Sequence, residues 1–367
     1  MKKHHRNLVC AVIAGLGSTL GGGIPAYGDA AVFRDPLDAP AEETRRAASG
    51  AMFAVARAGG RLVAVGELGR IVISEDDGRN WRQVPVPVSA DLVAVHFPTP
   101  RQGWAVGHGG AVLHSADGGL SWTRQFDGRD AAQLLRTHYT RLRDAGDAGA
   151  ARFLAAVEVN FKNGPELPLL GVWFRNPDEG FVVGAFGLIF ATTDGGRHWE
   201  PWMDRVENPD ELHLTAIAGS GDDVLIVGEQ GRVWKLDAAA RRFTQRRTPY
   251  EGTLFGIVGD RGGIVAFGLR GNAVRSADGG DRWQALPMPA QSYNINASTL
   301  LDDGRLVLVT QGGGLLIGST DGAPFTARPA TVPSLLAGVA PAGADAVVVA
   351  GLAGVRREPL GQAGVRP

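Results

Sequence analysis

The 367-residue sequence contains one cysteine, Cys10, and almost no net charge. Cys10 lies in an N-terminal segment that we predict to be cleaved, so the mature chain would have no disulfide and no cysteine nucleophile. No later segment reaches about 18 consecutive apolar residues, which excludes an ordinary membrane-spanning helix. The 37 Lys and Arg residues nearly balance the 38 Asp and Glu residues, giving a formal net charge of -1. This balance favours neither nucleic acid nor an acidic membrane surface as a partner.

The first 28 residues have the order of features of a secretory signal peptide. A basic start, MKKHHR, precedes a short apolar stretch diluted by glycine, and Ala26 and Gly28 are small residues suited to cleavage. We therefore predict a signal peptide over residues 1–28 and an exported protein, located in the periplasm or, in a photosynthetic host, in the lumen. A retained N-terminal anchor is the alternative. Cys10 lies too early to be a convincing lipoprotein anchor.

Glycine is abundant, and much of it belongs to a repeated motif. The 53 glycines are about twice the usual proportion. The pattern [ST]-x-D-x-G-x-x-W occurs at residues 74–81, 115–122, 192–199 and 276–283, and weaker copies surround Asp237 and Asp321. Repetition of this kind argues against a single active site built from the motif.

The spacing of the motif predicts the fold. Successive copies lie 41 to 43 residues apart, except for one interval of 77. A Gly-x-x-Gly step precedes each strong copy and extends the series to seven units. Each unit contains about four short apolar runs bounded by turn residues, and a four-stranded repeat of about 40 to 45 residues is typical of a propeller blade. We predict an all-β, seven-bladed β-propeller of four-stranded blades, forming a single domain over residues 29–367.

The seventh unit has too few strands. No outer strand follows residues 354–358, so we predict that residues 30–36 supply it and thereby close the ring with the two ends of the chain.

The repeated motif has a structural explanation. An Asp side chain can accept hydrogen bonds from backbone N–H groups two residues on, and glycine permits the positive φ of a tight hairpin. The Trp begins the next strand, where it can pack on the neighbouring sheet while its indole N–H donates to a carbonyl. We predict structural turns, with metal or phosphate binding as the alternative. The residues concerned are Asp76, Trp81, Asp117, Trp122, Asp194, Trp199, Asp278 and Trp283.

The doubled interval contains a segment of helical character. Residues 128–166 lack strand alternation, and Ala131, Leu135, His138 and Leu142 share one helical face. We predict a helical hairpin inserted between blades two and three. Arg129, Arg136 and Arg143 repeat every seven residues beside this face, so the insert either packs on the propeller side or docks a partner through a basic stripe.

The repeats resemble those of a known family. The [ST]-x-D-x-G-x-x-W boxes look like the Asp boxes, or bacterial neuraminidase repeats, of several propeller families. Combined with the preceding Gly-x-x-Gly hairpin, as in GELGRIVISEDDGRNW, they are similar to the photosystem II stability/assembly factor family over about residues 50–358. The resemblance implies a non-enzymatic seven-bladed propeller that docks onto membrane-protein partners. We accordingly expect a monomeric assembly, stability or scaffold factor for a membrane-associated complex, peripheral to the membrane at most and without a cofactor.

The Gly-x-x-Gly hairpins are the candidate partner-binding sites. In a propeller, hairpins between the second and third strands share a face with the loops that link blades. Arginine there is suited to bidentate contacts with carboxylates, whereas simple solvation would equally explain polar hairpin tips. The candidates are Glu67, Arg70, His108, Glu229, Arg232 and Arg270.

The alternative is a sialidase-like glycoside hydrolase or a carbohydrate-binding propeller. VFRDP at residues 32–36 faintly resembles a sialidase arginine motif, and a sialidase needs a Tyr nucleophile paired with Glu. Tyr250 and Glu251 are the only adjacent pair, while Tyr139 lies in the insert. The histidines show no metal-ligand spacing. We therefore predict no catalytic residues and no metal site.

Overall fold

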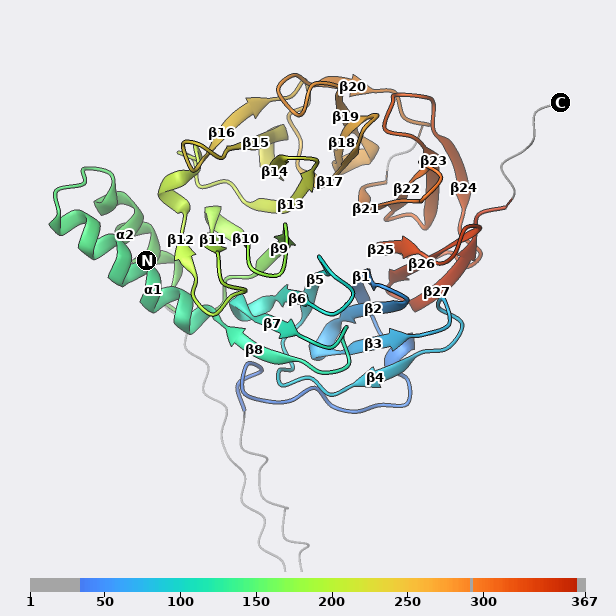
Figure 1. Cartoon of the computed structure of the whole chain (residues 1–367), viewed down its shortest axis with the longest axis horizontal. Helices are drawn as coiled ribbons and strands as arrows, with labels where there is room; N and C mark the ends of the chain where they lie inside the picture. Colours follow the sequence, from blue (N-terminus) through green and yellow to red (C-terminus); the bar gives the residue numbers. More distant parts are fainter. Residues whose placement is uncertain (1–33, 291–292, 362–367) are drawn as a thin grey trace, which may run out of the picture. The chain divides into compact units, whose positions relative to one another are not determined.

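The computed structural model describes residues 34–290 and 293–361, which form seven antiparallel sheets arranged in a ring (Figure 1). Six of the sheets have four strands and one has three, and within each sheet the strands follow one another in sequence order. The seven-bladed β-propeller predicted from the repeats is confirmed. We number the blades 1 to 7 along the chain.

The first three blades contain twelve strands. Blade 1 consists of β1 (Met52–Ala58), β2 (Arg61–Gly66), β3 (Ile71–Ser74) and β4 (Arg82–Val84). Blade 2 consists of β5 (Leu92–His96), β6 (Gly103–Gly107), β7 (Val112–Ser115) and β8 (Thr123–Phe126). Blade 3 consists of β9 (Leu169–Phe174), β10 (Gly180–Gly184), β11 (Ile189–Thr192) and β12 (Glu200–Pro201).

The remaining blades complete the ring. Blade 4 consists of β13 (Leu214–Ser220), β14 (Asp223–Gly228), β15 (Arg232–Asp237) and β16 (Arg242–Arg247). Blade 5 consists of β17 (Leu254–Asp260), β18 (Gly263–Gly268), β19 (Ala273–Ser276) and β20 (Gln284–Leu286). Blade 6 consists of β21 (Ile295–Leu300), β22 (Leu306–Thr310), β23 (Gly314–Gly318) and β24 (Thr326–Pro329). Blade 7 consists of β25 (Leu336–Pro341), β26 (Ala346–Gly351) and β27 (Gly354–Pro359).

The ring is closed by contacts between first strands and by a short helical turn. β1 contacts β5 on one side and β25 on the other, and the first strands lie nearest the centre of the ring throughout (Figure 1). The 3-10 turn η1 (Ala47–Ser49) packs against β27 of blade 7 and against β3 and β4 of blade 1. This turn therefore joins the two ends of the ring without adding a strand.

The predicted closing strand does not form in the part of it that the structure describes. The Asp35 carboxylate and carbonyl accept hydrogen bonds from the backbone N–H groups of Leu37 and Asp38, which makes a turn at Pro36. The Pro36 carbonyl accepts from Ser89 N–H, between blades 1 and 2. The prediction for residues 30–36 is therefore wrong for residues 34–36, because a turn anchored there cannot pair with β27. Residues 30–33 and the predicted signal peptide lie outside the described residues.

The Asp boxes form self-contained turns. In blade 1, Ser74 Oγ donates to Asp76 Oδ1 over 2.8 Å and accepts from Gly78 N–H, while Asp76 Oδ1 accepts from Asn80 N–H over 2.8 Å. The Asp thus bonds to the residue four positions on, and not two as predicted. Hydrogen bonds from Asn80, chiefly that from its backbone N–H, hold the pKa of Asp76 at about 2. The Trp81 indole N–H donates to the Gly78 carbonyl, which joins the turn to the next strand.

The helical insert is part of the hydrophobic core. It comprises α1 (Gly128–Asp144) and α2 (Ala150–Asn160) and confirms the predicted hairpin. Asp127 caps α1 by accepting from Arg129 N–H, and Asp130 accepts in return from Asp127 N–H. On the inner face Ala131 and Leu135 are buried as predicted.

The inner face of α1 differs in one respect from the predicted face. His138 and Leu142 are only half-buried, and Tyr139, four residues after Leu135, is fully buried instead. The Tyr139 hydroxyl donates to Asp204 Oδ1 over 2.9 Å, which ties the insert to the chain that follows blade 3. Within the described ranges, no helix has the length and apolar character needed to cross a membrane.

Candidate partner-binding face

Five Gly-x-x-Gly hairpins project from one face of the ring. Each connects the second and third strands of its blade through a single 3-10 turn: η2 (Glu67–Gly69), η3 (His108–Gly110), η4 (Ala185–Gly187), η6 (Glu229–Gly231) and η7 (Leu269–Gly271). The middle residue of every turn has a φ between 53° and 65°. We call the surface formed by these hairpins, the corresponding hairpins of blades 6 and 7 and the short loops between blades the hairpin face.

Backbone hydrogen bonds hold each hairpin on the loop that enters its blade. Glu67 N–H donates to the Ala51 carbonyl in blade 1, and His108 N–H donates to the Asp91 carbonyl in blade 2. The same bond recurs in blades 3, 4 and 5. These bonds pair a backbone N–H group of each turn and hold the turn in place. The side chains of the turns therefore form a fixed pattern on the hairpin face.

Three of the predicted residues on this face already have partners. Arg70 Nη1 lies 2.6 Å from Glu67 Oε1, and the same carboxylate oxygen accepts from Ala51 N–H. The Glu229 carboxylate accepts from His213 N–H over 2.8 Å. Glu67, Arg70 and Glu229 therefore stabilise the hairpins, which reduces the charge that they offer to a partner.

The other predicted residues differ in accessibility. His108 and Arg270 are exposed at hairpin tips, where their side chains are accessible to a partner. Arg232 is half-buried, and its Nε atom is buried without a hydrogen-bond partner among the described residues. Of the six predicted hairpin residues, His108 and Arg270 are thus the two with exposed side chains.

Sequence reasoning missed a set of apolar residues on the hairpin face. Seven large hydrophobic side chains are exposed among the described residues, and five of them belong to the hairpins or inter-blade loops of this face: Leu68, Phe186, Tyr293, Val332 and Leu352. Leu68 and Phe186 occupy the third position of the Gly-x-x-Gly step, and an apolar residue at a turn tip is the signal that could have indicated them. Exposed apolar side chains gathered on one face indicate an interaction surface.

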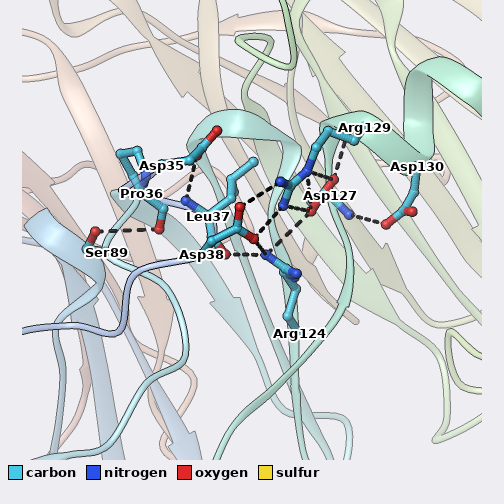
Figure 2. Close-up of polar contacts among 9 residues, drawn as sticks. All are labelled: Asp35, Pro36, Leu37, Asp38, Ser89, Arg124, Asp127, Arg129 and Asp130. Carbon is cyan, nitrogen blue, oxygen red and sulfur yellow. Dashed lines mark hydrogen bonds and ion pairs between the residues drawn. The ribbon is translucent and has the colours of Figure 1, made fainter. Parts of the chain in front are cut away.

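The three predicted insert arginines all have acidic partners. Arg129 Nη1 and Nη2 donate to the two oxygens of the Asp38 carboxylate over 2.8 and 2.9 Å. Arg129 also forms an ion pair with Asp127. Figure 2 shows Asp38 lying between Arg129 of α1 and Arg124 of β8. Hydrogen bonds from Arg129 and then Arg124 hold the pKa of Asp38 well below its usual range. Arg129 therefore fastens residues 35–44, the N-terminal strap, to the base of the insert.

The rest of the basic stripe is also neutralised locally. Arg136 Nε lies 2.9 Å from Glu158 Oε1 and thereby joins α1 to α2, and Arg143 pairs with the adjacent Asp144 over 2.8 Å. Exposed pairs of this kind contribute little to stability, but they lower the net positive charge of the insert.

The tyrosines required by the sialidase alternative lie in unsuitable places. The Tyr250 hydroxyl donates to the Leu269 carbonyl over 2.8 Å, and burial raises the pKa of Tyr250. Burial likewise raises the pKa of Tyr139, whose hydroxyl is bound to Asp204. A raised pKa makes a phenol a weaker nucleophile at neutral pH. Over the described ranges, no three His, Asp or Glu side chains gather as a metal site would require.

Comparison with known proteins identifies the family. The sequence model of the family described as "Photosynthesis system II assembly factor YCF48" matches residues 41–142 and 150–245, which together exceed half of the chain. The chain belongs to this Ycf48 family. The gap in the match, residues 143–149, covers the last two residues of α1 and the turn that leads to α2.

The individual relatives have low sequence identity to this member of the Ycf48 family. The chain is 28% identical over 144 residues to the chloroplastic photosystem II stability/assembly factor HCF136 of Cyanidioschyzon merolae, a match that covers 34% of this chain and about a third, 32%, of the relative. The structure titled "YCF48 bound to D1 peptide" has a TM-score of 0.61 and 16% identity, covering 85% of this chain and 94% of that one. A streptogramin B lyase has a TM-score of 0.63 and 11% identity, covering 84% and 93%. These structures share the fold.

The last glycine of the Gly-x-x-Gly step in blade 4 of this Ycf48-family chain provides a test of how tightly the hairpin packs on the loop between blades. Gly231 has a φ of +64°, and a Cβ atom built on it would lie 1.6 Å from the Tyr250 carbonyl oxygen. We expect Gly231→Ala to lower the free energy of unfolding by about 2 to 4 kcal/mol, because overpacking adds to the cost of a positive φ. Urea denaturation would measure the loss. Gly304→Ala is the control, since Gly304 has a φ of +85° with no atom near its Cβ position, and should cost about 1 kcal/mol. Equal losses would show that the contact with the inter-blade loop does not constrain the hairpin.

Proposed function

We propose that this chain is an exported, non-catalytic factor that assists the assembly or stability of a membrane-associated protein complex. Membership of the Ycf48 family is the observation that supports this function. The family description names photosystem II assembly, and a structural relative is titled as bound to a D1 peptide. The protein would act as a monomer in the periplasm or lumen, peripheral to the membrane at most.

The hairpin face is the proposed binding surface. Its exposed Leu68, Phe186 and Leu352 side chains supply apolar contacts, and the exposed Arg270 and His108 supply polar ones. Protein interfaces combine apolar anchors with a polar rim in this way. A soluble segment of a membrane-protein subunit laid across the hairpin tips would bury the apolar side chains, and its carboxylates would pair with arginine.

Affinity purification with matched surface variants tests this proposal. The tagged full-length protein would be purified from the membrane fraction of its host after mild crosslinking. The double variant Leu68→Asn and Phe186→Asn removes two exposed apolar anchors, and asparagine tolerates the positive φ at both positions. We expect the yield of one membrane complex to fall about tenfold, equivalent to about 1.4 kcal/mol of binding free energy.

A second pair of substitutions controls for general loss of apolar surface. Leu120 and Val159 are also exposed but lie in the blade 2 Asp box and on α2 of the helical insert, outside the hairpins. Leu120→Asn with Val159→Asn should leave the yield unchanged. If the wild-type protein recovers no membrane complex, the assembly role is wrong. If both double variants lose the complex equally, the assignment to the hairpin face is wrong.

A further inference from the structure

A pocket of about 760 Å³ lies between blades 3 and 4, on the face opposite the hairpins. Its walls come from the β9–β10 hairpin and the Asp box of blade 3, and from the β13–β14 and β15–β16 turns of blade 4. These two blades are neighbours in the ring, with β9 in contact with β13 (Figure 1). The volume lies within the usual range for small-ligand sites. The hairpin face and its proposed partner do not account for this pocket.

The pocket exists because blade 4 lacks an Asp box. In blade 1, Val63 pairs with Ile73, and the next residue is the box residue Ser74. In blade 4, Leu225 pairs with Lys235, so Leu236 stands in the place of the box Ser. Ala238 accordingly stands in the place of the box Asp, and the weak motif copy around Asp237 is out of register by one residue. The β15–β16 connection, residues 238–241, is also shorter than the β3–β4 connection, residues 75–81.

Elsewhere the second glycine of an Asp box covers the preceding blade. A Cβ atom built on Gly119 of blade 2 would lie 2.8 Å from Val63 of blade 1, and one built on Gly280 of blade 5 would lie 2.3 Å from Leu225 of blade 4. Phe181 occupies the corresponding position in blade 3, because it pairs with the residue before the box Thr192. With no box turn in blade 4 to cover it, Phe181 lines the pocket.

Aromatic side chains form much of the pocket wall. Phe181 packs edge-on against Trp202 with ring centroids 5.1 Å apart, and the half-buried Trp173 lies at the β9 end of the pocket. Trp199, the box Trp of blade 3, also lines the pocket and is 8% exposed. Its Nε1 atom has no hydrogen-bond partner among the described residues, whereas Trp81, Trp122 and Trp283 each donate to a box glycine carbonyl. The Trp199 indole N–H thus lacks the hydrogen-bond partner that the other boxes provide internally.

Charged groups of both signs surround the aromatic surface. Glu179 and Asp222 line the pocket with carboxylates that form no hydrogen bond or ion pair to any described residue. Arg175 lies over the Trp173 ring at 5.6 Å and donates to the Asp222 carbonyl. Glu200 is neutralised by Arg205 and Arg241, both of which lie over the Trp202 ring. These cations already occupy positions over the aromatic rings that a cationic ligand would use, and the free carboxylates would repel an anion.

We propose that this pocket binds a neutral saccharide. Sugar hydroxyls donate and accept hydrogen bonds, so they can use the free carboxylates of Glu179 and Asp222 together with the guanidinium donors of the exposed Arg175. The apolar face of a sugar ring would lie on the half-buried Phe181, which has no cation from the described residues over its ring. The site is separate from the proposed partner-binding face, so its ligand can be tested independently of the assembly role.

A glycan array followed by calorimetry tests the saccharide site. The purified full-length chain would be applied to neutral hexose and N-acetylhexosamine oligosaccharides and to their sialylated counterparts, and the best ligand would be titrated. We expect a neutral glycan to bind with a Kd of about 1 mM or tighter and to be preferred over its sialylated form. Ala238→Trp should weaken binding at least about tenfold, because Ala238 is exposed on the turn that borders the pocket and a bulky ring there fills its mouth.

A neighbouring substitution provides the matched control. Ala239 is exposed in the same turn but does not line the pocket, so Ala239→Trp should bind the glycan as the wild type does. Thermal unfolding of both variants would establish that the fold is kept. The proposal is overturned if no neutral glycan binds saturably, if sialylated glycans bind better, or if the two variants bind alike. Preferential binding of an oligolysine peptide to the same pocket would also overturn it.

Discussion

Replacing Trp104 with alanine is expected to lower the free energy of unfolding by about 3 to 5 kcal/mol. Trp104 in β6 is fully buried, and its ring stacks on Phe174 in β9 with centroids 3.6 Å apart and an interplanar angle of 7°. Its indole N–H donates to Gln125 Oε1 over 3.0 Å. The substitution therefore removes packing between blades 2 and 3 and leaves a polar atom of Gln125 without its partner. Urea denaturation followed by far-ultraviolet circular dichroism would measure the change.

An exposed aromatic residue controls for the loss of ring area. Tyr293 is 56% exposed on the hairpin face, and Tyr293→Ala should change the free energy of unfolding by less than about 0.5 kcal/mol. Trp104→Phe keeps an aromatic ring but removes the donor, so its loss should lie between those of the two alanine variants. A loss below about 1 kcal/mol for Trp104→Ala would contradict the view that the blade 2–blade 3 contact is tightly packed.

Acidification from pH 7 to pH 4 is expected to destabilise the protein through His96 by at most about 3 kcal/mol. Burial lowers the pKa of His96 to about 4, and the hydrogen bond between Nε2 and the Phe174 carbonyl opposes this only in part. The unfolded chain binds the proton near pH 6.5, whereas the folded chain binds it only near pH 4. The contribution is therefore fully present above about pH 6.5 and is lost as the pH falls toward 4. Because the residue keeps partial contact with solvent, about 3 kcal/mol is an upper bound.

The variant His96→Gln isolates this contribution. A glutamine amide can still donate to the Phe174 carbonyl but does not titrate, so the variant should lose less stability than the wild type between pH 7 and pH 4. Part of the slope of the free energy of unfolding against pH will remain in this variant, because burial also lowers the pKa of His114 and of His138. His108→Gln, at an exposed hairpin tip, is the control for replacing a histidine that is not buried. An unchanged slope in His96→Gln would show that His96 is protonated in the folded protein well above pH 4. Chemical denaturation at each pH would give the comparison.

Departures from the repeat mark the features that distinguish this chain from a regular propeller. The insertion after β8 places two helices against blade 3, and Arg129 at its base also holds the N-terminal strap. The loss of the Asp box in blade 4 opens the pocket beside Phe181. In both places the sequence breaks the period, and in both the structure has a surface that the regular blades do not possess.

Much of the fold could be predicted because its signals are local. The Asp box closes through bonds between Ser74, Asp76 and the next few residues, so its sequence suffices to identify the turn. The seven repeat units marked by the Gly-x-x-Gly steps, with their spacing, predict the ring, and the period-3.6 pattern in residues 128–142 predicts the first helix of the insert. The backbone N–H group that binds the Asp carboxylate belongs to the residue four positions later. This pairing depends on the geometry of the turn, which composition does not reveal.

The candidate sites were predicted less completely because they depend on neighbours distant in sequence. Arg129 resembles a free cation in the sequence, yet Asp38, 91 residues earlier, neutralises it. Glu67 and Arg70 were singled out for charge, and they pair with each other. Leu68 and Phe186 were overlooked, since an apolar residue inside a hairpin is ordinarily expected to be buried, and only the fold shows that the tip points into solvent.

The sequence by itself determined the number of blades, the structural turns and the position of the helical insert, because each rests on contacts within about ten residues or on a repeated period. The tertiary structure alone decided how the ring closes, which charges remain free and where the pocket opens. These features arise where one blade meets the next, and a sequence period describes a blade but not the packing between two blades.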